Sequence, residues 1–327
     1  MTRIALRTLL LVAVCAAVAP AQSIVSARAG AVHHIEGKVL LDGEPVVMEF
    51  AKFPQMDEGD VLETELGRAE VLLTPGVVLR LAEHSAIKMI SNRLTDTRVE
   101  FLRGSALIEA VELLKDNAVT FTAGDAVIHF EHEGLYRLDS DPLQLRVYKG
   151  KARVFQNDRT LVAKKGKIVE LEPFLVATKF DPKQNDALYR WSARRSSYMA
   201  MANISAARYM DRWGIPWNVS GWRWNPYFGL FTFVPAGGIY YSPFGYSFWS
   251  PAHVYLVYSP PQPVFGGGGG GTFSPRHGYV VVGSRGVSVS GTGSGAATGG
   301  TAATTTTGSR GGGGTIGRGG ASGGRGR

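Results

Sequence analysis

The side chains best suited to metal or acid–base chemistry are His129, Glu131, His132 and Glu133. Imidazole and carboxylate groups bind zinc and transfer protons, so a reaction centre would be sought here first. Alternate residues of a strand point to opposite faces, which places His129, Glu131 and Glu133 on one face and His132 on the other. Ligands from this segment alone do not converge. We interpret it as a solvated strand face.

Motifs of the common enzyme classes are absent from the sequence. Outside the low-complexity glycine-rich tail, where chance matches are expected, it has no G-x-S-x-G nucleophile turn, and it has no G-x-x-x-x-G-K-[ST] phosphate loop and no H-E-x-x-H metal helix. His33 and His34, near the N-terminus, give no stronger indication of a metal site. The sequence therefore predicts a non-enzymatic protein without a metal or cofactor, and an enzyme ranks third among the functional classes.

Aromatic side chains offer a second kind of chemistry, in residues 213–258, which hold five of the six tryptophans. Exposed tryptophan and tyrosine rings stack on sugar rings or lie at a membrane boundary. The residues that we predict for such contact are Trp222, Trp224, Tyr240, Tyr241 and Trp249. The alternative is that these rings form a small core or cover an edge of the preceding domain, and the sequence leaves both open.

Short strands separated by turn residues precede the rings, from about residue 32 to residue 178. In residues 67–73 Ala69, Val71 and Leu73 alternate with polar Arg68 and Glu70, which predicts an apolar face and a face in water. The other predicted strands span 35–41, 45–49, 59–64, 77–81, 86–91, 98–102, 106–111, 119–122, 126–130, 135–139, 143–148, 152–155, 167–171 and 174–177. Only residues 106–114 fit a helical period as well.

A Gly59-Asp60 strand, a Gly67-Arg68-Ala69-Glu70 strand and a Pro75-Gly76 turn follow one another in this domain. This order resembles the core of the FecR domain family. The resemblance, over residues 32–178, implies an all-β periplasmic module without catalysis. In iron-uptake regulators of the family the module follows a cytoplasmic sigma-factor-binding region and a membrane helix. Neither is found in this sequence, so we do not expect a direct anti-sigma role.

A short motif, basic-Gly-x-apolar, occurs three times, at Arg103-Gly104, Lys149-Gly150 and Lys165-Gly166. Repeated units of hairpin size favour a coiled or stacked sheet over a Greek-key sandwich. The predicted fold is therefore mainly β: a twisted or solenoid-like all-β domain (30–178), then one long helix, an aromatic, proline- and glycine-rich extension (212–262) and a disordered glycine-rich tail (263–327).

The helix is predicted over residues 179–211, with Asp181 as N-cap and Pro182 at the first helical position. Its apolar stripe comprises Leu188, Trp191, Tyr198, Ala202, Ala206 and Tyr209. We expect it to pack on the β-domain through Leu188 and Trp191. A helix that binds a partner or lies on a membrane is the alternative.

The first 29 residues have the basic, apolar and small-residue pattern of a secretory signal, with cleavage near residue 21 or residue 29. The single cysteine, Cys15, would leave with it. The formal net charge of +8 comes from arginines at position 212 and beyond, since that segment holds eight arginines, no lysine and no acid. Export argues against a nucleic-acid partner for this basic tail.

These features predict a periplasmic or secreted protein of the cell envelope that contacts a protein or polymer. One class is a regulator that relays an envelope signal to a membrane partner. The other is a protein that binds polysaccharide or peptidoglycan, or acts as a scaffold, through the aromatic extension. Peripheral contact with a membrane is a further option.

Overall fold

The structure is a computed structural model that describes residues 28–114 and 116–257. Fifteen of its strands form one sheet, which confirms the prediction of a mainly β fold. These strands are β1 (Ala31–Leu41), β2 (Glu44–Pro45), β3 (Val61–Leu72), β4 (Val77–Leu81), β5 (Ala86–Arg93), β6 (Asp96–Arg103), β7 (Ser105–Ala110), β8 (Ala118–Ala123), β9 (Ala126–Phe130), β10 (Gly134–Ser140), β11 (Leu143–Lys149), β12 (Lys151–Gln156), β13 (Arg159–Lys164), β14 (Lys167–Glu170) and β15 (Val176–Lys179).

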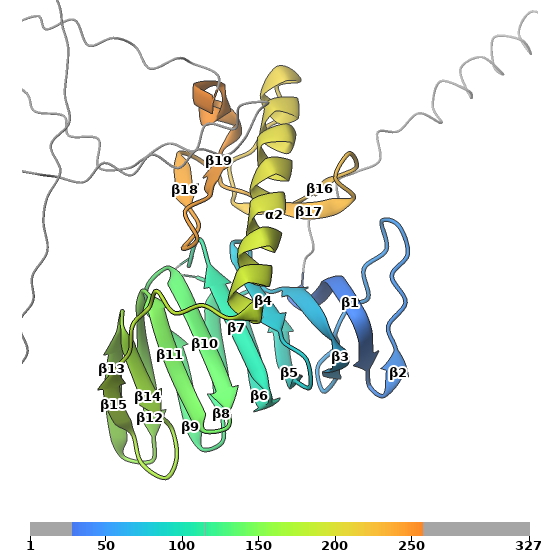
Figure 1. Cartoon of the computed structure of the whole chain (residues 1–327). Coiled ribbons are helices and arrows are strands. Elements are labelled where there is room, and N and C mark those ends of the chain that lie inside the picture. The colour runs from blue at the N-terminus through green and yellow to red at the C-terminus, as the bar shows by residue number, and fades with distance from the viewer. Residues whose placement is uncertain (1–27, 115, 258–327) are drawn as a thin grey trace, which may run out of the picture.

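The sheet folds back on itself and is nearly closed. Its strand order is β13-β12-β9-β8-β6-β5-β3-β4-β7-β10-β11-β14-β15, with β1 beside β3. Figure 1 shows β4, β7, β10 and β11 as one layer and β5, β6, β8 and β9 as the other. Strand β3 joins the layers, because residues 61–63 pair with β5 and residues 69–72 pair with β4. All of these pairings are antiparallel except β6 with β8.

Two glycines lie opposite each other where β1 and β3 pass between the layers. Gly37 pairs with Gly67, and the register shifts just after Gly37. A Cβ atom at Gly67 would lie 2.5 Å from the carbonyl oxygen of Glu36, so only glycine fits this crossing without a shift of the backbone.

The repeated basic-Gly motif marks other passages between the layers. Gly104, Gly150 and Gly166 connect β6 to β7, β11 to β12 and β13 to β14, and each link joins one layer to the other. All three have positive φ angles, from +78° to +99°. The repeat therefore encodes corners of one folded sheet.

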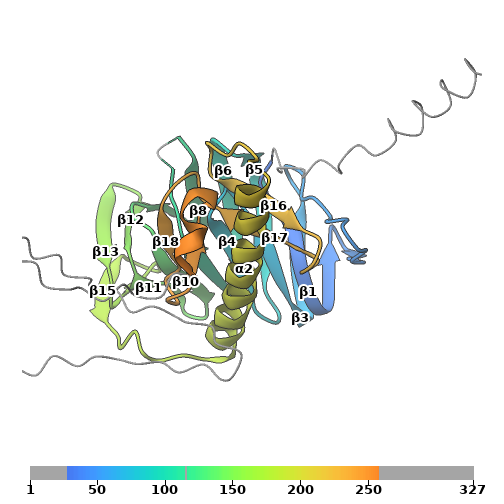
Figure 2. The same ribbon diagram turned by 90° about the horizontal axis from the view of Figure 1, so that it is seen from above.

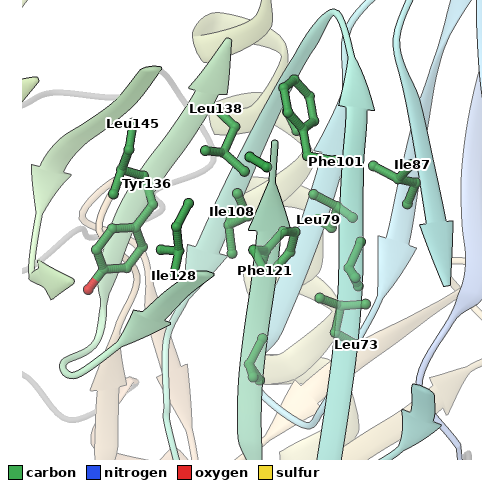
Figure 3. Close-up of a cluster of buried hydrophobic side chains, with 14 of the residues drawn as sticks. Leu73, Leu79, Ile87, Phe101, Ile108, Phe121, Ile128, Tyr136, Leu138 and Leu145 are labelled. Atoms are coloured by element: carbon green, nitrogen blue, oxygen red, sulfur yellow. The ribbon is translucent and has the colours of Figure 1, made fainter. Parts of the chain in front are cut away.

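Apolar side chains from both layers meet between them. Figure 3 shows Leu79, Ile108 and Leu138 of one layer facing Ile87, Phe101 and Phe121 of the other. All six are at most 2% exposed. The alternation along β3 and β4 supplies this core, since Ala69 and Val71 are buried in it together with Leu79 and Leu81.

Most predicted strands are present, and the differences lie at chain positions with weak patterns. Residues 106–114, ambiguous by period, start as the strand β7. The predicted strand 45–49 is reduced to the two-residue β2, and the predicted strands 59–64 and 67–73 are one continuous strand, β3. Strand β13 was not predicted; it lies at one end of the sheet with mostly exposed side chains.

Helix α2 comprises Ala187–Arg212, and its N-cap is Asp186. The predicted N-cap, Asp181, is therefore wrong: its carboxylate accepts a hydrogen bond from the Lys183 N–H in a turn five residues earlier. Leu188 and Trp191 pack on Leu107, Leu135 and Tyr148 of the sheet, which confirms the predicted contact.

Parts of the predicted apolar stripe of the helix are exposed. Tyr198 and Tyr209 are 48% and 50% exposed, whereas Ala202 and Ala206 are buried. The buried face is instead completed by polar residues, among them Arg195, Ser196 and Asn203. A hydrophobic period could not show this, because the surface against which α2 packs is itself partly charged.

The aromatic extension is ordered around α2 as two hairpins and a short helix. They are β16 (Gly221–Asn225) with β17 (Leu230–Val234), β18 (Ile239–Tyr241) with β19 (Ser247–Trp249), and the 3-10 helix η1 (Pro251–Val257). Figures 1 and 2 show the two hairpins on opposite sides of α2. Buried Asn203 of α2 donates to the carbonyl oxygens of Phe233 and Trp249, which ties both hairpins to the helix.

The predicted signal segment up to residue 27 and the predicted tail from residue 263 lie outside the described residues. Ala29 is buried, and its N–H donates to the Asn92 carbonyl at 2.8 Å, a contact that cleavage near residue 21 would retain. Within the described part of the chain, no helix is long and apolar enough to cross a membrane.

Candidate functional site

The polar face of the central strands is buried, which corrects the prediction that it lies in water. Glu70 on β3, Arg80 on β4 and Glu109 on β7 are at most 1% exposed. Helix α2 and the extension cover them: Met199 and Ala200 of the helix and Trp222 of β16 lie in one buried cluster with Leu72 and Val78 of this face.

A charge cluster fills this interface, and we define it as His33, Glu70, Arg80, Glu109 and Arg195. Arg80 donates from Nε to Glu70 at 2.7 Å and from Nη1 to Glu109 at 2.6 Å. Arg195 of α2 donates to the other oxygen of Glu70 at 2.8 Å. The two carboxylates and two guanidinium groups therefore balance in charge while they are removed from water.

Hydroxyl groups complete the hydrogen bonding of Glu109. Ser196 of α2 donates to Glu109 Oε1 at 2.7 Å, and Ser242 of the extension donates to the same oxygen. One carboxylate on the sheet thus holds both the helix and the extension.

His33 connects this charge cluster to the hairpin β16–β17. Its Nδ1 lies 2.8 Å from Glu70 Oε1, and its Nε2 accepts the Phe231 N–H at 2.8 Å. Because Nε2 accepts a hydrogen bond, the ring is neutral and Nδ1 carries the proton that it donates to Glu70. Burial lowers the pKa of His33, and Arg195 and Arg80 lower it further, against the opposite effect of Glu70.

The carboxylate of Glu70 stays ionised. Burial alone would raise its pKa, but Arg195, Arg80 and the hydrogen bond from His33 hold that pKa well below its ordinary value. Each group of the charge cluster is committed to a neighbour of fixed geometry. The arrangement suits the fixing of the cover on the sheet.

The segment with His129 has no ligand geometry. Glu131 forms ion pairs with Lys151 at 2.6 Å and with Arg153 at 2.5 Å, and His129 Nδ1 lies 3.2 Å from Thr120 Oγ1. Among the described residues, no three histidine, cysteine or acidic side chains are grouped as they would be around a metal ion.

The five predicted contact residues differ in burial. Trp222 is 1% exposed, and its Nε1 donates to the Leu73 carbonyl at 3.1 Å, so its ring is part of the interior. Trp224 lies against Phe50, Phe53 and Phe231, half-buried.

Tyr240 and Trp249 are half-buried as well, and Tyr241 is 37% exposed. Tyr240 lies edge-on to Phe233, and a hydrogen bond with Glu112 raises its pKa. These five rings therefore do not form one exposed surface.

A different set of rings lines an open groove of about 1100 Å³ at the C-terminal end of α2. We call it the aromatic groove, and its lining includes Tyr209, Asp211, Arg212, Trp213, Tyr227 and Tyr255. Trp213 is 66% exposed and Tyr227 is 85% exposed. The rings of Tyr209 and Trp213 are 6.4 Å apart between centroids. Trp213 and Tyr227 lie in the aromatic stretch of the sequence, but nothing in their spacing separates them from the buried rings.

Comparisons with known proteins add little to this site. No protein-family model and no curated protein matches the sequence. Two crystal structures of proposed anti-sigma factors from Parabacteroides distasonis ATCC 8503, at 2.50 and 1.65 Å resolution, are similar to this chain at 15% and 14% sequence identity. Each has a TM-score of 0.33, and each match covers 38% of this chain and 61% of the solved chain. The chain thus spans less than two thirds of their length, and this likeness carries no argument about function.

Proposed function

We propose that this is an exported, non-enzymatic protein of the bacterial cell envelope that contacts a large envelope partner through the aromatic groove. The observation that carries the proposal is the set of rings left exposed there, although the same extension buries Trp222, Phe233 and Phe248 in its own core. Large exposed rings gathered in one hollow are typical of interaction sites. The secretory pattern of the N-terminus and the FecR resemblance support the envelope as the setting.

Photocrosslinking in the cell tests this function. A photoreactive phenylalanine analogue at Tyr227 is expected to give discrete adducts in the envelope fraction. The same analogue at Leu66, which is 73% exposed within β3, is the matched control and is expected to give none. Recovery of the full chain from the cytosol, or equal adducts at both positions, would contradict the proposal.

A second candidate is a regulator that relays an envelope signal to a membrane partner through a sheet edge. Strand β15 favours it, since all four of its residues are exposed and, among the strands of residues 28–257, it pairs only with β14. An unpaired edge can accept a strand from another protein. Adducts with a membrane protein from the analogue at Thr178, and none at Tyr227, would select this class over the first.

A further inference from the structure

We infer that the aromatic groove binds a glycan chain that carries carboxylate groups. This inference deepens the proposed function and rests on it. Three rings with more than half of their surface in water, Trp213, Tyr227 and Tyr255, share one hollow with Asp211 and Arg212. A sugar ring has apolar C–H faces and an equatorial belt of hydroxyl groups, so it requires rings and hydrogen-bonding groups together.

The rings are held by rigid elements, which reduces the entropy lost on binding. Tyr209 lies in the last turn of α2 and Trp213 is its C-cap residue. Gly214, at φ +58°, follows the cap, and the Ile215 N–H donates to the Met210 carbonyl at 2.9 Å. Both rings therefore project from a capped helix end.

Tyr227 is placed by the turn between β16 and β17. Asn225, which is buried, accepts the Tyr227 N–H on its side-chain oxygen at 3.0 Å and donates from Nδ2 to the Ala202 carbonyl of α2 at 2.9 Å. The turn is thereby fastened to the same helix that carries Trp213. Tyr255 is placed by η1, whose Val254 is buried beside it. Three elements converge on one hollow.

The charges of the groove favour an anionic glycan over the other envelope surfaces. The lining contains Arg208 and Arg212 against one acid, Asp211, a balance that attracts carboxylates and still offers an acceptor to hydroxyl groups. Insertion of these rings into an anionic membrane would bring the carboxylate of Asp211 close to the lipid headgroups. A protein with a flat surface would not fill an open groove that is lined with charged groups.

Affinity electrophoresis of the purified full chain tests the inference. The probes are alginate as a polyuronate, dextran as a neutral glycan, and, by co-sedimentation, peptidoglycan sacculi and phosphatidylglycerol vesicles. We expect retention by alginate or by sacculi, and weaker retention by dextran. Trp213→Ala and Tyr227→Ala are each expected to weaken binding about tenfold, since a stacking face is lost. Tyr198→Ala removes a tyrosine of α2 that is 48% exposed and does not line the groove, and this variant is expected to bind as the unmodified chain does.

Several results would overturn the inference. They are no retention by any glycan, retention that survives both groove variants, equal retention by dextran, or binding to the vesicles alone. Circular dichroism of each variant establishes that it is folded. Protein adducts at Tyr227 in the crosslinking experiment, together with no glycan binding, would leave the proposed function standing and remove only this inference.

Discussion

Glu70 shows at the residue scale why a charged side chain on a strand does not by itself indicate solvent. Its carboxylate is fully buried and receives hydrogen bonds from Arg80, Arg195 and His33. In the sequence it alternates with Ala69 and Val71 as a surface residue would. The types and spacing of residues are the same in both cases, and only the cover supplied 125 residues later, by Arg195, distinguishes them.

Neutralising Glu70 is expected to lower the free energy of unfolding. Glu70→Gln keeps the shape of the side chain but leaves Arg80 and Arg195 with one carboxylate between them, and breaking a buried ion pair typically lowers the free energy of unfolding by about 3 to 5 kcal/mol. Glu65→Gln on the same strand is the control, since it removes a half-exposed ion pair with Lys38 and is expected to change that free energy by about 0.5 kcal/mol or less. Urea unfolding measures both. Equal effects would mean that the burial of Glu70 has no energetic consequence.

The charge cluster also predicts how stability depends on pH. The pKa of His33 is lowered from its ordinary value of 6.5, so the folded protein binds fewer protons than the unfolded chain as the pH falls through that value. Stability is therefore fully present above that pH and decreases as the pH falls towards the lowered pKa. The groups that face His33 are Glu70, Arg80, Arg195 and the Phe231 N–H.

The variant His33→Gln tests this dependence. A glutamine can donate to Glu70 and accept from Phe231 without titrating, so the fall in melting temperature between pH 7 and pH 5.5 should be smaller. His34, whose pKa is lowered by burial and by Arg195, contributes in the same direction, and His34→Gln measures its share. An unchanged slope in the His33 variant would show that this imidazole is not the titrating group.

At the scale of elements, the start of α2 depends on a tertiary contact. Asp181 and Asp186 are both acceptable N-caps by residue type, and the sequence favoured Asp181 because Pro182 follows it. Asp186 caps the Tyr189 N–H at 2.9 Å and also pairs with Arg137 of β10. This second bond anchors the first turn to the sheet. It could not be predicted from the local sequence, because Arg137 lies 49 residues before Asp186.

Exchanging each aspartate for alanine tests which of the two caps the helix. Asp186→Ala is expected to lower the free energy of unfolding by about 1 to 2 kcal/mol, through loss of the cap and of the pair with Arg137. Asp181→Ala, at a position that is also exposed, is expected to change it by about 0.5 kcal/mol or less. Denaturant unfolding with an unchanged m-value gives both numbers. The reverse order would restore Asp181 as the start of the helix.

Strands were predictable where one face packs against the core, since alternate residues of such a strand must be apolar. The basic-Gly repeat predicted a coiled sheet correctly because its glycines adopt the positive φ angles that the corners between the layers need. Strand β13 was missed because it ends the sheet with little burial. The aromatic groove was missed because both the buried and the exposed parts of the extension contain aromatic rings, and only packing separates Trp213 from Trp222.

At the scale of the whole molecule, the extension is part of the folded body. Trp222 inserts between the sheet and its own hairpin, where its ring lies 6.1 Å from that of Phe233 and its Nε1 reaches Leu73. The Trp222→Ala variant is expected to lose about 3 to 5 kcal/mol in the free energy of unfolding, from lost burial and the cavity left behind. Trp213→Ala, in the exposed groove, is expected to change it by about 0.5 kcal/mol or less.

Urea unfolding and limited proteolysis read out this pair. In Trp222→Ala we expect faster cleavage within residues 213–257, because the hairpin has lost its anchor, and in Trp213→Ala we expect the cleavage rate of the unmodified protein. Equal resistance of the two variants would show that the extension does not depend on its buried tryptophan.

The bond between His33 and the Phe231 N–H spans 198 positions of the chain. A polypeptide that emerges from its N-terminus can assemble the two layers long before this partner arrives, and until then Glu70, Arg80 and Glu109 remain hydrated. Maturation is therefore completed by the last-made third of the described chain. A truncated product that ends before residue 187 would leave this charged face of the sheet exposed to water, whereas the full chain buries it. Proteases that degrade incompletely folded proteins could distinguish the truncated product from the full chain.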